Sequence, residues 1–163
     1  MKKVIPNLLS ALRLVLIPFL LWAIQINATS FCVGLILLAM VSDLLDGFLA
    51  RRWQVASRRG TFVDALADFL FLFSGFLALA WMGVVPWWFL LLLLLSFAHF
   101  IEGLWRETPY DPIGKYIGAY LYGFLLLIFL VPNPWLHQLL LVIGTGYLLL
   151  ILIYRQIRAG RKE

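Results

Sequence analysis

The sequence predicts an all-α integral membrane domain with six transmembrane helices and with both chain termini in the cytoplasm. Its composition is the first observation, since 64% of the residues are hydrophobic and 13% are charged. Soluble domains contain roughly 45–50% and about 25%, respectively. The second is a series of apolar segments of nearly uniform length, and the third is the collection of all charged residues at one end of these segments.

Six apolar segments have about the 20-residue length that a membrane-spanning helix requires. In chain order they cover residues 8–26, 31–51, 62–82, 86–105, 113–131 and 135–154. The breaks at 27–30, 83–86 and 132–134 contain residues typical of turns, and those at 52–61 and 106–112 are polar and charged. With 163 residues, the chain is expected to form a single domain, residues 1–163.

The basic residues determine the predicted orientation. In a six-helix arrangement all 13 Lys and Arg residues fall on one side, and the three opposite loops contain none. Under the positive-inside rule that side is the cytoplasm, or the cytoplasmic face of the inner membrane in a bacterium. We therefore expect the basic residues to set topology in a lipid bilayer, and we expect no nucleic-acid partner. The eight acidic residues lie in the same half, which favours a reaction site at one face.

Four aspartates form the clearest candidate site. Asp43 and Asp46 share one face of the second helix, and Asp64 and Asp68, four residues apart, share one face of the third. If the two faces meet, four carboxylates enter one pocket, at a cost of up to about 10–14 kcal/mol on membrane-insertion scales. Divalent cations would offset this cost, and carboxylate ligands favour Mg²⁺ or Mn²⁺. Four aspartates could hold two ions about 3.5–4 Å apart, a spacing suited to phosphoryl displacement.

Small and basic residues continue the acidic face of the second helix. Gly47 and Ala50 remove side-chain bulk there, so that a substrate can approach the backbone, or they serve only helix packing. Arg51 offers a planar fork for phosphate oxygens, or it is part of the topology signal. Arg106 and Lys115, beside the third cytoplasmic loop, either bind an anionic acceptor or are merely solvated.

Two other functions are compatible with intramembrane aspartates. A cation- or proton-coupled transporter would use them as a transit site, and it predicts ionisable groups that reach the opposite face. A structural membrane subunit predicts that the aspartates can be replaced without chemical consequence. The uncharged opposite loops argue against the transporter.

The acidic residues and their spacing resemble the signature of the CDP-alcohol phosphotransferases, D-x2-D-G-x2-A-R-x8-G-x3-D-x3-D. All eight specified positions agree: Asp43, Asp46, Gly47, Ala50, Arg51, Gly60, Asp64 and Asp68. A preceding pattern, P-N-x-x-[ST]-x-x-R-x4-P, is similar to the family as well, with Pro6, Asn7, Ser10, Arg13 and Pro18. The signature spans 26 residues, and the remainder of the chain agrees in its six-helix plan.

The resemblance implies a phospholipid-synthesis transferase that moves a substituted phosphate from a CDP-linked lipid, typically CDP-diacylglycerol, to an alcohol. It implies that the four aspartates ligate two Mg²⁺ or Mn²⁺ ions and that Asp68 is also the general base. The implied binding residues for the CDP part are Asn7, Ser10, Gly47, Ala50, Arg51, Ser57 and Gly60. A homodimer is suggested by the family alone.

The acceptor is the open question, with glycerol 3-phosphate as the first expectation. Many phosphatidylglycerophosphate and cardiolipin synthases of the family have D-P-x-A-D-K in the second half of the signature. This chain has Ala65 in place of the proline and Phe69 in place of the lysine. The departure weakens assignment to those two branches and leaves the alcohol undetermined.

Overall fold

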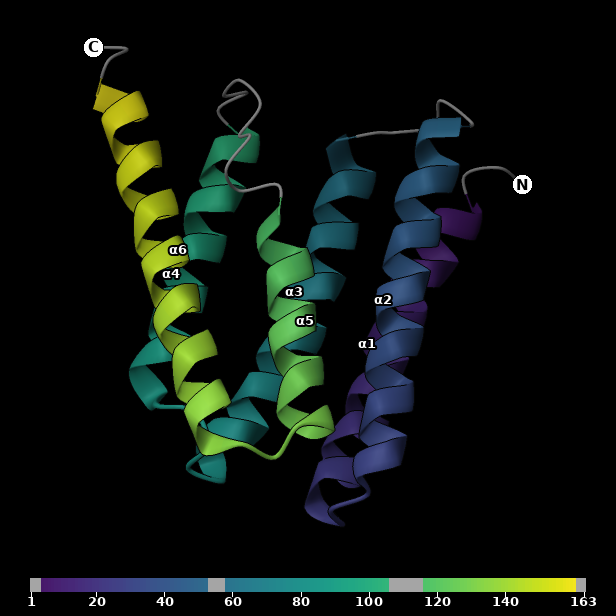
Figure 1. Ribbon diagram of the computed structural model, residues 1–163. Coiled ribbons are helices and arrows are strands. Elements are labelled where there is room, and N and C mark those ends of the chain that lie inside the picture. The colour runs from purple at the N-terminus through teal and green to yellow at the C-terminus, as the bar shows by residue number, and fades with distance from the viewer. Residues whose placement is uncertain (1–3, 53–57, 106–115, 161–163) are drawn as a thin grey trace.

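The computed structural model is a bundle of helices, and it describes residues 4–52, 58–105 and 116–160. Six helices and no strands occur in these ranges (Figure 1). They are α1 (Val4–Gln25), α2 (Thr29–Arg52), α3 (Arg58–Trp81), α4 (Trp87–Trp105), α5 (Ile117–Leu130) and α6 (Pro134–Gly160). The six-segment prediction is confirmed at the level of helices, with boundaries shifted by a few residues.

Four helices are long and apolar enough to cross a membrane: α1, α3, α4 and α6. The apolar parts of the other two are shorter, at Thr29–Leu45 in α2 and Ile117–Leu130 in α5. The first turn of α1 and the last turn of α6 lie at the same end of the bundle, beside the end of α2 and the start of α3 (Figure 1). This end corresponds to the side on which the sequence places the basic residues.

Local sequence explains the turns at the other end. Asn27 and Gly83 have positive φ angles of 54° and 75° and close α1 and α3. In both turns the next residue donates its backbone N–H five residues back, from Ala28 to Ala23 and from Val84 to Leu79, each at 2.9 Å. This is the Schellman pattern of helix termination. The start of α6 is capped by Asn133, whose side-chain oxygen accepts the Trp135 N–H at 3.0 Å.

The packing order of the helices differs from the expected one in one respect that matters for the site. Helix α1 packs against both α2 and α3, whereas the described parts of α2 and α3 make little contact with each other. Helix α5 also contacts α2 and α3, and α6 packs on α4 and α5. The sequence suggested that the acidic faces of the second and third helices meet directly, but a side chain from α1 lies between them.

Buried apolar side chains from all six helices form the core. Phe76, Phe89 and Phe124, from α3, α4 and α5, are buried with ring centroids 5.4–5.9 Å apart. Such clusters add about 0.5–1.5 kcal/mol per pair beyond the burial of their area. They fix α5 beside α3, which brings residues from both helices to the acidic site.

Candidate active site

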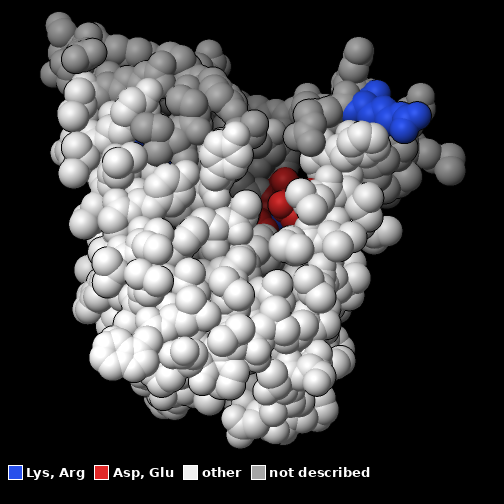
Figure 2. All heavy atoms as spheres, in the orientation of Figure 1, with Lys and Arg blue, Asp and Glu red and all other residues white. Residues whose placement is uncertain are grey.

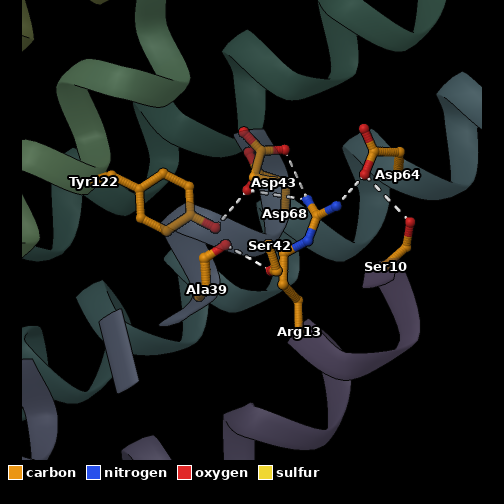
Figure 3. A network of polar contacts seen from close by, with 8 residues as sticks. All are labelled: Ser10, Arg13, Ala39, Ser42, Asp43, Asp64, Asp68 and Tyr122. Atoms are coloured by element: carbon orange, nitrogen blue, oxygen red, sulfur yellow. Dashed lines mark hydrogen bonds and ion pairs between the residues drawn. The ribbon is translucent and has the colours of Figure 1, made fainter. Parts of the chain in front are cut away.

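Arg13 of α1 is the centre of the polar cluster (Figure 3). Its side chain is completely buried. Nη1 donates to Asp43 Oδ1 at 3.1 Å and to Asp68 Oδ1 at 3.4 Å, and Nη2 donates to Asp64 Oδ1. Because a guanidinium has five N–H donors in a rigid plane, it can bind several carboxylates at once. One arginine thus joins α1, α2 and α3 at the site.

Ser10 extends the same face of α1. It lies three residues before Arg13, which places the two side chains on one side of the helix. The buried Ser10 hydroxyl donates to Asp64 Oδ1 at 3.2 Å. Asp64 therefore receives hydrogen bonds from two residues of α1.

Asp68 is held from a second direction by α5. The hydroxyl of Tyr122, a buried residue, donates to Asp68 Oδ1 at 2.6 Å. The Tyr122 ring stacks on Phe71 of α3, with centroids 6.1 Å apart, so the ring is fixed by packing. Gly118, one turn earlier on α5, faces the other carboxylate oxygen, since a Cβ placed there would lie 3.6 Å from Asp68 Oδ2.

The carboxylates remain accessible although the arginine does not. The side chains of Asp43, Asp64 and Asp68 are 36%, 33% and 20% exposed. Figure 2 shows Asp or Glu atoms inside a hollow of this face, near the end where α1 begins and α6 ends. A charged substrate can therefore reach the acidic oxygens, while the buried guanidinium holds the carboxylates through hydrogen bonds on their inner side.

The structure brings together four of the predicted site residues: Ser10, Asp43, Asp64 and Asp68. Two predicted glycines lie on the same helices. Gly47 is one turn after Asp43, and Gly60 is within the first turn of α3 rather than in the preceding loop, because α3 begins at Arg58.

The remaining predicted site residues cannot be placed in the cluster. Asn7 lies on α1, and Asp46, Ala50 and Arg51 lie on α2, with side chains outside the described part of the structure. Ser57, Arg106 and Lys115 lie outside the described residues altogether.

Two residues of the polar cluster, Arg13 and Tyr122, were not assigned a role from the sequence. Arg13 was recognised as part of a pattern and of the charge distribution, but neither indicates that its guanidinium pairs with aspartates 30–55 residues away. Tyr122 had a weaker signal, a hydroxyl in an otherwise apolar helix, which Tyr120 shares. Tyr120 donates instead to the Leu140 carbonyl of α6, so its hydroxyl joins two helices away from the acidic cluster.

Three accessible carboxylates lie close together around one guanidinium. Carboxylate oxygens are the ligands that hard divalent cations prefer, so these residues suit such an ion. Among the described side chains, however, no group of three or more carboxylate, imidazole or thiolate ligands is arranged around a metal position. Arg13 takes the central place and supplies the positive charge there. The Asp cluster thus has ligands of the type that such ions prefer, and one oxygen of each of the three carboxylates is bonded to an arginine.

Comparison with known proteins identifies the family. Residues 3–153 match the family described as CDP-alcohol phosphatidyltransferase. The cardiolipin synthase (CMP-forming) of Streptomyces coelicolor is 34% identical over 157 residues, which cover 88% of this chain and 73% of the relative. A putative cardiolipin synthase of Mycobacterium tuberculosis is 30% identical over 89% of this chain and 74% of its own length.

A shorter match to another member of the family has higher identity. The CDP-diacylglycerol–glycerol-3-phosphate 3-phosphatidyltransferase of Salmonella choleraesuis is 43% identical over 72 residues, 39% of this chain and 37% of the relative. Together with the long apolar helices and the complete eight-residue signature, these matches establish that the chain is an integral membrane enzyme and that it belongs to the CDP-alcohol phosphatidyltransferase family.

Proposed function

We propose that the enzyme transfers the phosphatidyl group of CDP-diacylglycerol to a hydroxyl of a glycerol-based acceptor, with release of CMP. The observation that carries this proposal is the gathering of Asp43, Asp64 and Asp68 of the family signature around the buried Arg13, with all three carboxylates partly exposed. The end of the bundle at which these residues lie is where a lipid headgroup and a water-soluble reactant can meet. The transporter alternative has no comparable support, since the chain belongs to a family of transferases.

The reaction is a displacement at phosphorus. The acceptor oxygen forms a bond to the phosphorus that carries the diacylglycerol, and the bond from that phosphorus to the CMP oxygen breaks, so that CMP leaves with the electron pair. Asp68 takes the proton of the attacking hydroxyl. A general base must lie within hydrogen-bond reach of that proton. Asp68 of α3 is the signature carboxylate that accepts hydrogen bonds from both Arg13 of α1 and Tyr122 of α5.

Arg13 and the other aspartates prepare the site for an anionic donor. Arg13 offsets part of the negative charge of three carboxylates and fixes their positions. Two bound divalent ions, held by Asp43, Asp46, Asp64 and Asp68, would supply the remaining positive charge and polarise the donor phosphate. The CDP part of the donor would bind beside these ions, at Gly47, Ala50, Arg51 and Gly60.

The acceptor is proposed from the relatives and remains a choice between two alcohols. Cardiolipin carries two phosphatidyl groups on one glycerol, so the long similarity to cardiolipin synthases supports phosphatidylglycerol as the acceptor. The shorter similarity to the Salmonella enzyme supports glycerol 3-phosphate, the first expectation from the sequence. The lack of a lysine at position 69 excludes neither acceptor, because the similarity to the cardiolipin synthase spans this position. The Phe69 ring instead stacks on that of Phe97 of α4, with ring centroids 3.9 Å apart.

The proposal also assigns the site to the cytoplasmic face. In the six-helix topology predicted from the sequence, the basic residues that flank the helices lie on the same side of the membrane as the acidic cluster. The positive-inside rule predicts that this side is the cytoplasm. Labelling of single cysteines introduced near the start of α1 and at the turn before α6 would test the orientation. Reaction of the second position alone with a reagent that cannot enter intact cells is the expected result.

The test of the activity is acceptor-dependent release of CMP by the purified protein in detergent. With CDP-diacylglycerol and Mg²⁺ or Mn²⁺, we expect CMP to form when glycerol 3-phosphate or phosphatidylglycerol is added, and not with serine or inositol phosphate. Asp68→Asn should remove the activity and leave the fold intact. Glu102→Gln, the same carboxyl-to-amide change on α4, serves as the control. Near-normal turnover in Asp68→Asn would show that this carboxylate is not the base.

A further inference from the structure

The two oxygens of Asp68 have different surroundings (Figure 3). Oδ1 accepts hydrogen bonds from Tyr122 at 2.6 Å and from Arg13 at 3.4 Å. Within the described part of the chain no hydrogen bond reaches Oδ2, and the backbone of Gly118 lies beside it. The carboxylate is therefore anchored through one oxygen and has room at the other.

From this asymmetry we infer that α5 forms the acceptor-side wall of the active site. In this assignment, Tyr122 is a positioning residue that fixes Asp68 through Oδ1. Gly118 keeps the space next to Oδ2 clear, so that the acceptor hydroxyl meets Asp68 at Oδ2. The inference rests on the proposed function, in which Asp68 receives a hydroxyl group, and adds the direction from which that hydroxyl arrives.

The spacing on α5 supports the assignment. Gly118 and Tyr122 are four residues apart, so both lie on the face of α5 that is turned to α3. Tyr122 cannot easily turn away, because it is buried and its ring is stacked on the buried Phe71. A hydrogen bond from a fixed ring sets the plane of the carboxylate, and a base must be held within a fraction of an ångström for efficient reaction.

Gly118 and Gly123, both on α5, differ in which atoms would lie near a side chain added at each position. A Cβ at Gly118 would lie 3.6 Å from Asp68 Oδ2, an ordinary van der Waals contact that requires no movement of the protein. At Gly123 nothing lies within 4 Å of such an atom. An alanine at either position is thus compatible with the fold, but only at Gly118 would it occupy space next to the reactive oxygen.

The first test compares two tyrosines on the same helix. Tyr122→Phe removes the hydrogen bond to Asp68, and Tyr120→Phe removes the one to the Leu140 carbonyl. We expect Tyr122→Phe to lower kcat about 10- to 100-fold, the equivalent of losing one hydrogen bond to a charged group. The KM for CDP-diacylglycerol should stay within about twofold. Tyr120→Phe should lower the thermal stability, because it removes a hydrogen bond between α5 and α6, and it should leave the kcat of the folded enzyme unaltered.

The second test compares the two glycines. Gly118→Ala should raise the KM for the acceptor about tenfold by crowding the approach to Oδ2, with little change in the KM for CDP-diacylglycerol. Gly123→Ala should leave both KM values unchanged. If Gly118→Ala matches Gly123→Ala, or raises the donor KM instead, the acceptor does not approach along α5.

A spectroscopic measurement separates this inference from the proposed function. The infrared carboxylate band of Asp68, obtained as the wild type minus Asp68→Asn difference, should shift in Tyr122→Phe and stay in place in Tyr120→Phe. An unchanged band in Tyr122→Phe would overturn the positioning role whatever the enzyme's substrate is. A wild-type protein that forms no CMP with any acceptor would instead contradict the proposed function, and the infrared result would still decide whether Tyr122 holds Asp68.

Discussion

Replacement of Arg13 by methionine should destabilise the protein and make its stability depend on divalent cations. Arg13 is completely buried and donates to three carboxylates that are 20–36% exposed. Hydrogen bonds to buried charged groups contribute about 1.5–3 kcal/mol, and exposed ion pairs about 0–1 kcal/mol. With about 1 kcal/mol for each of these intermediate contacts, the variant loses about 3 kcal/mol, which is at the lower end of the cost of removing one partner from a buried ion pair.

The assay is thermal unfolding in detergent, with and without Mg²⁺ or Mn²⁺. A loss of about 3 kcal/mol lowers Tm by about 6–12 °C for a domain of this size. A cation that binds only the folded state at 100 times its dissociation constant restores about 2.7 kcal/mol. The cation should raise the Tm of Arg13→Met more than that of the wild type, because in the variant three carboxylates lack their guanidinium.

Arg155→Met is the matched control for this experiment. Arg155 also joins two helices, by donating to the Ser96 carbonyl of α4 at 3.1 Å, but it is not part of the acidic cluster. Its variant should lose stability without any added response to divalent cations. Equal responses of Arg13→Met, Arg155→Met and the wild type to Mg²⁺ and Mn²⁺ would refute the idea that Arg13 and divalent ions neutralise the same carboxylates.

Three further outcomes are expected. Ser10→Ala removes one hydrogen bond to Asp64 and should lower CMP release by about two- to tenfold, as measured by initial rates, with a Tm change within a few degrees; an unchanged rate would count against a role for Ser10. Gly144→Ala should cost about 1–3 kcal/mol in thermal unfolding, because its Cβ would lie 2.9 Å from the Tyr120 ring, whereas Gly146→Ala, with nothing within 4 Å, should be neutral or slightly stabilising; equal Tm values would contradict the α5–α6 packing. Removal of divalent cations by a chelator should abolish CMP formation and re-addition of Mg²⁺ or Mn²⁺ should restore it, and persistent activity in the chelator would contradict the metal-dependent proposal.

The helices and the acidic faces could be predicted because both depend on spacing along the chain. Long apolar runs identify membrane helices, and the separation of Asp64 from Asp68 by four residues fixes their common face. The Schellman turns at Asn27 and Gly83 also fall at breaks that local residue types indicate. The family signature added the expected chemistry of these residues.

The arrangement of the site could not be predicted because it depends on which helix faces which. Helical periodicity gives the face of a residue and not its partner helix, so the sequence could not show that α1 separates α2 from α3. The contact between Tyr122 and Asp68 joins residues 54 positions apart. The packing of α5 against α3 brings this pair together, and it includes the contact of Phe76 with Phe124 and the stacking of Tyr122 on Phe71.

The most direct measurement of the central claim follows the fate of the phosphatidyl group. The purified enzyme would receive CDP-diacylglycerol labelled in its acyl chains, a divalent cation, and either phosphatidylglycerol or glycerol 3-phosphate, and the labelled lipids would be separated. We predict that the label appears in a phosphatidylated glycerol product in an amount equal to the CMP released, and that Asp68→Asn forms neither. Label that remains in CDP-diacylglycerol, or that appears only as phosphatidic acid through transfer to water, would contradict the account.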